Sequence, residues 1–260
     1  MALIGTLTSG VSSLKTFSKG LEVIGNNIAN VNTTGYKSNA ASFADTFSNT
    51  LRSGGASVQI GTGVQVAALS TNFSQGSLTS TGKGTDLGVS GNGYFVVQDG
   101  NGANYATRDG AFHWDATGNL INSQGFNVLD DTGAAINVAT ASTATAITIG
   151  LDGAITAFAA DGTTTSTQKV GLLNINDESL LTKLGTNLYD FTPTGALVTD
   201  IGTPKSVGLG SIQSGALELS NVDLTEQFSE LITTQRSFQA GSRLITISDS
   251  VLEDIVNLKR

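Results

Sequence analysis

The sequence predicts an α+β protein in which paired long N- and C-terminal helices, coiled-coil-like, enclose a discontinuous all-β outer domain. Apolar residues recur every seven residues at both ends of the chain, whereas short β-type segments alternate with turns in the middle. The glycines follow the same division, because most of them lie between Gly54 and Gly215. We therefore expect a helical assembly domain at 1–35 and 221–260, a connector at 36–62 and a β-rich outer domain at 63–220.

The N-terminal segment predicts an amphipathic helix with a narrow apolar seam. Two rows of large apolar residues follow the seven-residue repeat, with Ser, Thr, Lys and Asn between them. The pattern stops in the Asn- and Thr-rich segment 26–35, where polar side chains compete for the backbone and Gly35 permits a left-handed exit. The predicted N-terminal seam consists of Leu7, Leu14, Phe17, Leu21, Ile24 and Ile28.

The C-terminal segment predicts a longer helix of the same kind. Ser220 and Asp223 have the spacing of a capping box, and no proline occurs from Ser220 to Arg260. A helix of about 38 residues would be roughly 57 Å long. Because a strict heptad is present at both termini, we interpret it as an assembly surface rather than as the cover of a single domain's core. The predicted C-terminal seam consists of Leu224, Phe228, Leu231, Phe238, Ile245, Leu252 and Ile255.

The middle of the chain predicts short strands joined by tight turns. Asp-Gly, Thr-Gly-Asn and Asp-Thr-Gly sequences supply the backbone conformations that hairpins require, at 109–110, 117–119, 131–133, 152–153 and 161–162. The Ser/Thr-rich segments 139–148 and 163–167 are expected on an outer loop or edge. The predicted strands are 63–67, 93–97, 146–149 and 170–175.

The composition excludes several kinds of site and partner. The chain has no cysteine and one histidine, His113, so a thiolate site and a multi-histidine metal centre are both excluded. A net charge of -8 repels nucleic acid and anionic lipid. The chain lacks an apolar run of the roughly 20 residues that cross a bilayer, and it lacks the pattern of a cleaved signal peptide. We expect no nucleic-acid partner and no membrane insertion.

The sequence contains parts of several catalytic and metal-binding motifs, but each of these motifs is incomplete. Asp131-Thr132-Gly133 matches half of an aspartic protease site, but a second copy is missing. Gly82-Lys83-Gly84 lacks the spacing and the hydroxyl residue of a phosphate loop. The acidic turns at 99–102 and 115–118 lack the ligand pattern of an EF-hand. We therefore expect no enzyme activity, no cofactor and no metal.

Residues 26–37 carry a resemblance to a known family. Asn26-Asn27-Ile28-Ala29-Asn30-Val31-Asn32-Thr33-Thr34-Gly35-Tyr36-Lys37 resembles the N-terminal motif of bacterial flagellar rod and hook proteins. The segments 219–224 and 234–238 are similar to the C-terminal motif of that family, and 61–64, 91–95 and 108–112 resemble its β-domain landmarks. The family-motif residues singled out here are Asn26, Asn27, Asn30, Gly35 and Tyr36.

The resemblance implies a mechanical function. The terminal helices would pair and line a tube, and the β domain would form its outer shell. Members of this family are exported unfolded through the flagellar type III apparatus without a cleaved signal. The implied partners are further copies of the chain in a helical homopolymer, neighbouring rod, hook, cap or junction proteins, and the export apparatus.

The resemblance leaves two family members open. Residues 42–47 and 218–224 look like the hook protein, which is extracellular and transmits torque. The length of 260 residues instead resembles a distal-rod protein, the periplasmic drive shaft. The sequence favours a short hook-type subunit, with the distal rod as the alternative. From another class, a secreted β-rich adhesin or carbohydrate-binding module would also suit the Ser/Thr-rich strands.

Overall fold

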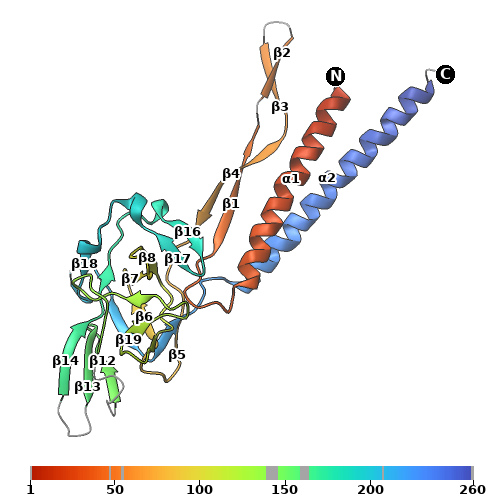
Figure 1. Ribbon diagram of the computed structural model, residues 1–260. Helices are drawn as coiled ribbons and strands as arrows, with labels where there is room; N and C mark the ends of the chain where they lie inside the picture. Colours follow the sequence, from red (N-terminus) through yellow and green to blue (C-terminus); the bar gives the residue numbers. More distant parts are fainter. Residues whose placement is uncertain are drawn as a thin grey trace. The chain divides into compact units, whose positions relative to one another are not determined.

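The computed structural model describes residues 2–46, 48–53, 56–138, 146–158, 164–206 and 208–258. The chain forms two compact units (Figure 1). The helical unit contains Met1–Val31, Ser38–Asn72 and Val222–Arg260, and the β unit contains Asn32–Lys37 and Phe73–Asn221. Two long helices with a strand-rich unit between them confirm the predicted α+β class.

The boundaries of the units differ from those expected from the sequence. Residues 38–72 lie with the helices, where a connector at 36–62 and a β domain from 63 were expected. The reason is that this segment forms a β ribbon that packs on a helix. The predicted turn at 161–162 and residues 139–145 and 163 of the Ser/Thr-rich segments lie outside the described residues.

The helical unit is built on an antiparallel helix pair. Helix α1 spans Ala2–Ala29 and helix α2 spans Leu224–Leu258. Asp223 caps α2, because its carboxylate accepts the backbone N–H groups of Thr225 at 2.8 Å and Glu226 at 3.4 Å. The capping box predicted at Ser220 is therefore wrong. The predicted box placed the cap at Ser220, three residues before Asp223. The free N–H groups of the first turn of α2 are within reach of the Asp223 carboxylate.

A β ribbon packs against α1. Strand β1 (Asn39–Asp45) pairs antiparallel with β4 (Val64–Thr71), and β2 (Ser48–Ser53) pairs with β3 (Ala56–Gly61). The rings of Phe17 and Phe43 meet edge to face with centroids 5.9 Å apart. The Thr16 hydroxyl donates to the carbonyl of Val64 at 3.0 Å. These contacts explain why the ribbon belongs to the helical unit.

The β unit contains short strands around one large sheet. In the described part of the chain this sheet has the order β16-β17-β8-β7-β11-β10-β9, and β15 pairs with both β7 and β18. Short 3-10 helices occur at Glu178–Leu180, Thr192–Thr194 and Val198–Asp200. The strands are β5 (Leu78–Ser80), β6 (Leu87–Ser90), β7 (Tyr94–Gln98), β8 (Asn104–Thr107), β9 (His113–Trp114), β10 (Leu120–Ile121), β11 (Asn127–Val128), β12 (Ala146–Ile149), β13 (Ala154–Phe158), β14 (Thr164–Lys169), β15 (Leu172–Leu173), β16 (Thr182–Gly185), β17 (Leu188–Asp190), β18 (Ile201–Gly202), β19 (Ser211–Ser214) and β20 (Ala216–Glu218).

The predicted strands are found with changes in length. Residues 64–67 begin β4, 94–97 begin β7, and 146–149 are β12, whereas only 172–173 of the segment 170–175 form a strand. Strands β12 and β14 are the two edges of a three-stranded sheet, so the described residues 146–148 and 164–167 of the Ser/Thr-rich segments lie on edge strands.

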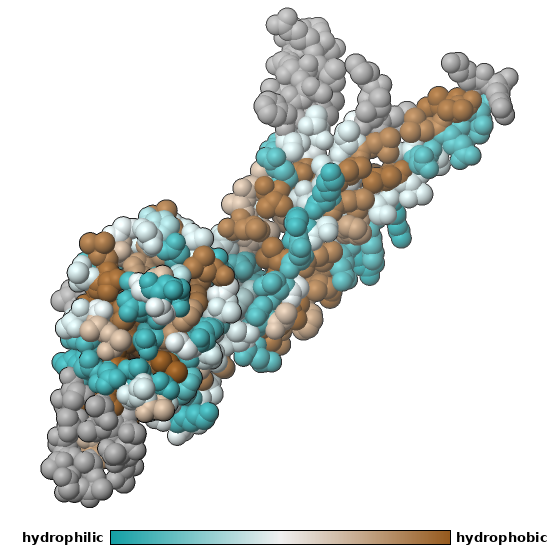
Figure 2. All heavy atoms as spheres, in the orientation of Figure 1, coloured by the Kyte–Doolittle hydropathy of each residue, from teal (hydrophilic) through white to brown (hydrophobic). Residues whose placement is uncertain are grey.

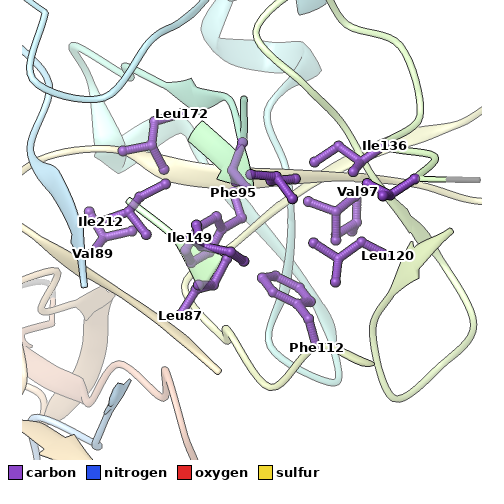
Figure 3. Packing of buried hydrophobic residues seen from close by; sticks show 14 of the residues in the cluster. Leu87, Val89, Phe95, Val97, Phe112, Leu120, Ile136, Ile149, Leu172 and Ile212 are labelled. Carbon is purple, nitrogen blue, oxygen red and sulfur yellow. The ribbon is translucent and has the colours of Figure 1, made fainter. Parts of the chain in front are cut away.

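The core of the β unit lies on both faces of β7. Phe95 and Val97 belong to one apolar cluster, and Tyr94 and Val96 belong to a second cluster on the opposite face. Figure 3 shows Phe95 and Phe112 among the residues of the first cluster, and their rings meet at 88° with centroids 5.2 Å apart. A strand buried on both faces explains the continuous apolar run that marks β7 in the sequence.

Candidate assembly surface

The two helices meet along rows of small and polar residues. The buried residues of α2 are Gln227, Thr234, Gly241 and Ser248, which recur every seven residues. Each of them faces a residue of α1 that follows the same repeat. The facing pairs are Thr6 with Ser248, Ser13 with Gly241, Gly20 with Thr234, and Asn27 with Gln227. We call these four pairs the polar seam.

Glycines allow the helix backbones to approach closely along this seam. A Cβ atom added to Gly241 would lie 2.7 Å from the Ser13 hydroxyl oxygen, and one added to Gly10 would lie 2.9 Å from Cγ1 of Ile245. At the outer end of the seam the hydroxyl oxygens of Thr6 and Ser248 lie 3.4 Å apart. The seam therefore leaves no room for larger side chains at these glycines.

Asn27 forms the inner end of the polar seam. Its Nδ2 donates to the Gln227 Oε1 at 2.9 Å and to the Asn39 carbonyl at 2.8 Å. Its Oδ1 accepts the backbone N–H of Asn39 at 3.0 Å. Asn27 is buried, so one side chain joins α1, α2 and β1 through three hydrogen bonds.

The predicted heptad residues fall into two groups. Ile24 is buried and the other N-terminal seam residues, Leu7, Leu14, Phe17, Leu21 and Ile28, are half-buried. In α2 the rows divide between half-buried and exposed positions. Leu231, Phe238, Ile245 and Leu252 are half-buried, whereas Leu224, Phe228 and Ile255 are exposed. Part of the predicted seam is therefore used within the chain, next to the polar seam.

A second apolar row of α2 remains exposed. The outer stripe, as we call it, follows helical spacing in the last part of α2, where brown surface runs along the helices in Figure 2. It consists of Leu244, Ile247, Val251, Ile255 and Leu258. On α1, Leu7, Thr8, Val11, Ser12 and Lys15 line an open hollow of about 400 Å³. Both features offer apolar surface to a partner.

The last residues of the N-terminal motif lie in the β unit. Gly35 has a positive φ of 66°, and a Cβ atom there would lie 2.6 Å from the backbone nitrogen of Asp109. Tyr36 is buried, and the Lys183 ammonium lies 4.5 Å from the centre of its ring. In the exposed part of the motif, Asn30 Nδ2 donates to the carbonyl of Asn26 at 2.9 Å near the end of α1.

A buried charge cluster follows directly after this motif. Lys37 Nζ donates to Glu218 Oε1, and Arg108 Nη1 lies 3.5 Å from Glu218 Oε2. Glu218 Oε1 also accepts the backbone N–H of Gly76 at 2.9 Å. Lys37 and Glu218 have side chains with no exposed surface, and burial lowers the pKa of Lys37. Two cations thus share one carboxylate in the interior.

The charge cluster joins two segments of the β unit that lie far apart in the sequence, 35–37 and 218–221. The backbone N–H of Gly35 donates to the carbonyl of Glu218 at 2.8 Å, and the N–H of Asn221 donates to the carbonyl of Tyr36 at 3.4 Å. Lys37 and Glu218 each lie in a motif that the sequence singled out, but their pairing across 181 residues has no local signal. Asn27 was singled out as a family-motif residue, but the other residues of the polar seam were missed, because small and polar side chains carry no apolar periodicity.

The described residues hold neither a metal-binding cluster nor a membrane span. A group of three or more His, Asp or Glu side chains suited to a metal ion is absent from them. Within the same residues, neither helix is apolar and long enough to cross a bilayer.

Comparison with known families matches three segments of the chain. Residues 7–37 match the flagella basal body rod protein family, residues 88–157 match the flagellar hook protein FlgE/F/G D1 domain, and residues 213–258 match the flagellar basal body rod FlgEFG protein C-terminal family. The matches therefore include both helices and part of the β unit.

Individual relatives agree with these matches. The chain is 39% identical to the flagellar basal-body rod protein FlgG of Bacillus subtilis, over 99% of this chain and 100% of that protein. It is 36% identical to FlgG of Agrobacterium fabrum, over 89% of this chain and 90% of that protein. The flagellar hook protein FlgE of Salmonella typhimurium is 41% identical over 47% of this chain and 28% of its own length. The chain belongs to the family of bacterial flagellar rod and hook proteins.

Proposed function

We propose that this chain is a distal-rod subunit, a non-enzymatic structural protein that polymerises into the periplasmic drive shaft of the flagellum. Support comes from relatives named FlgG, which the chain matches over nearly their whole length, while it matches the hook protein over 28% of that protein. The hook-type subunit favoured by the sequence is therefore the weaker alternative. The comparisons favour an axial protein over an adhesin or carbohydrate-binding module as well.

The observation that carries the proposal is the exposed outer stripe. A helix that buries only one narrow face within its own chain leaves an apolar row in water, and covering one such side chain contributes about 1.5 to 3 kcal/mol. A second copy of the chain can cover this row. Contacts between unlike surfaces of successive copies give a ring when the rotation between copies closes and a helical filament when it does not, and the proposed drive shaft is the open case. Neighbouring rod, hook or junction proteins and the export apparatus are the further partners in this proposal.

A matched pair of charge substitutions tests the role of the outer stripe. Ile247 is exposed within the stripe, and Thr246, one position earlier, is exposed about 100° around the helix. Ile247→Asp places a carboxylate where a second copy would bury it, which costs several kcal/mol. Sedimentation of concentrated protein should show polymer for the wild type and for Thr246→Asp, and a much higher critical concentration for Ile247→Asp. Equal assembly of both variants would exclude the stripe as an interface.

Complementation separates the rod from the hook. The chain is expressed in a flagellated bacterium that lacks its distal-rod protein and, separately, in one that lacks its hook protein. We expect swimming to return in the first strain only. Rescue of the hook mutant alone would overturn the assignment to the rod and leave the family unchanged.

A further inference from the structure

The polar seam matches itself after a shift of one heptad. Its residues recur every seven positions on both helices. If α2 slid by seven residues, or about 10.5 Å, Ser13 would face Ser248 and Gly20 would face Gly241. Small residues would again oppose small residues within the polar seam, so these pairs by themselves do not choose between the two alignments.

The pair formed by Asn27 and Gln227 is the exception within the seam. A primary amide offers a donor and an acceptor in fixed positions, and Asn27 uses both on the backbone of Asn39 while its second N–H binds Gln227. After a one-heptad shift Asn27 would face Thr234, and Gln227 would leave the seam. A buried amide that loses its partner carries a desolvation penalty, which the other three pairs do not impose.

We propose that Asn27 is the residue that sets the register of the helix pair, acting through Gln227 on α2 and through Asn39 on the β ribbon. A single buried polar residue is known to fix the alignment of helices that apolar packing would leave ambiguous. Gly10 and Gly241 allow the close approach, and Asn27 selects the alignment. The register decides where the outer stripe of α2 lies along α1. The consequence for polymers rests on the function proposed above, whereas the register is a property of the single chain.

Disulfide trapping in the monomer measures the register directly. The natural chain has no cysteine, so any introduced pair reports alone. Thr6→Cys with Ser248→Cys reports the observed register, because the two hydroxyl oxygens lie 3.4 Å apart. Ser13→Cys with Ser248→Cys, and Ser13→Cys with Thr234→Cys, report a shift of one heptad in either direction. Residues offset by about 10.5 Å along the helices are too far apart to be bridged in the observed register.

Apolar replacements of similar size remove the amides from the seam. Asn27→Leu and Gln227→Met are made in each reporter background. Asn26→Leu and Gln239→Met are the matched controls, because Asn26 and Gln239 carry the same amides at exposed positions on the same helices. Circular dichroism at 222 nm verifies that every variant keeps its helices.

The wild type and both controls should form the 6–248 disulfide and leave both shifted pairs reduced. In Asn27→Leu the yield of a shifted disulfide relative to the 6–248 disulfide should rise about tenfold, as expected when the buried hydrogen bond between Asn27 and Gln227 no longer distinguishes the registers. The double variant Asn27→Leu with Gln227→Met should regain part of the lost thermal stability and still form shifted disulfides. If Asn27 only stabilised the helix pair, the double variant would regain stability without forming shifted disulfides. Shifted disulfides in a restabilised variant therefore show an effect on the register itself.

Two outcomes would overturn the proposal. If Asn27→Leu forms the 6–248 disulfide alone and at the wild-type rate, another part of the chain sets the register. If all three disulfides are lost, Asn27 holds the helices together and does not choose their alignment. The disulfides are measured in dilute monomer, so the test of the register does not depend on polymerisation. A wild-type chain that does not polymerise would contradict the proposed function and leave the result on the register unchanged.

Discussion

At the residue scale, Glu218 neutralises a buried cluster that also contains Lys37 and Arg108. Glu218→Gln keeps the shape of the side chain and leaves two buried cations without a negative partner. Removing one member of a buried ion pair costs about 3 to 5 kcal/mol. We expect a loss of that size in the free energy of unfolding of the β unit, measured by urea denaturation with the fluorescence of Trp114.

The matched control is an ion pair on the surface. Lys19 Nζ lies 2.7 Å from Glu22 Oε2, but both side chains are 67% exposed. Glu22 lies on α1, so Glu22→Gln is followed by circular dichroism at 222 nm, and it should change the free energy of unfolding of the helical unit by less than about 1 kcal/mol. Similar losses of unfolding free energy for Glu22→Gln and Glu218→Gln would mean that the buried cluster does not stabilise the contact between residues 35–37 and 218–221.

Two buried tyrosines beside the cluster allow a second comparison. The Tyr94 hydroxyl donates to Glu178 Oε1 at 2.8 Å, whereas the buried Tyr189 hydroxyl has no hydrogen-bond partner among the described residues. Tyr189→Phe should therefore keep or raise the free energy of unfolding at pH 7, by up to about 1 kcal/mol. Tyr94→Phe should lower it by about 1 to 3 kcal/mol, because Glu178 loses a donor. Thermal denaturation of both variants checks the two signs.

The same tyrosines predict how stability depends on pH. Burial raises the pKa of both Tyr94 and Tyr189 above the ordinary value of 10.0. Above pH 10 the unfolded chain loses protons that the folded chain keeps, so the free energy of unfolding falls as the pH rises. Tyr189→Phe should make this alkaline loss smaller. An unchanged pH profile in that variant would show that Tyr189 does not contribute to it.

At the element scale, the glycines of α1 have opposite predicted effects. An alanine at Gly10 meets Ile245 Cγ1 at 2.9 Å, whereas a Cβ atom at Gly25 has no neighbour within 4 Å in the part of the chain that the structure describes. Gly25→Ala should stabilise the helix by roughly 1 kcal/mol through helix propensity. Gly10→Ala should destabilise the pair, because overpacking costs about 1 to 3 kcal/mol and offsets that gain. The melting temperature of the helices is measured by circular dichroism at 222 nm. A change of the same sign in both variants would contradict this account.

The sequence predicts the helices better than it predicts what they touch. Both helices follow from their heptads, since large apolar residues dominate the periodic signal. Gly10 and Gly241 lie where the two helices approach most closely, but glycine has no apolar side chain and adds nothing to that periodic signal. The pairing of Asn27 with Gln227 depends on two helices 200 residues apart. The ribbon at 38–72 was expected to be a connector as far as residue 62 and part of the β-rich outer domain from residue 63, because its contacts with α1 are tertiary.

At the scale of the whole molecule, the two units should lose their structure separately. The buried residues of α2 in the helical unit are small or polar, whereas the β unit contains two large apolar clusters. Trp114, the single tryptophan, packs against one of these clusters. In urea the signal at 222 nm should fall at a lower concentration than the change in Trp114 fluorescence. Coincident transitions would show that the chain unfolds as one cooperative block.

The family was predictable from the sequence, but the choice of member was not. The motif at 26–37 is long enough to identify an axial protein, and the comparisons confirm that family. The choice of the hook depended on the short segments 42–47 and 218–224. The interior of the β unit places Glu218 against Lys37, so part of the second segment serves the fold itself. Residues that serve the fold itself do not distinguish one member of the family from another.

The hydrogen bonds between Gly35 and Glu218 and between Tyr36 and Asn221 make the β unit an inserted cassette. Its entry and exit are fastened to each other, so the chain returns close to the point where it left, whatever lies between. Insertions are tolerated best where the ends of a segment meet in this way. Outer domains of different size can therefore be exchanged on one helical framework. Grafting a larger outer domain in place of residues 73–217 would keep the ribbon at 38–72 on α1 and leave the helix pair a gap of the same width to close.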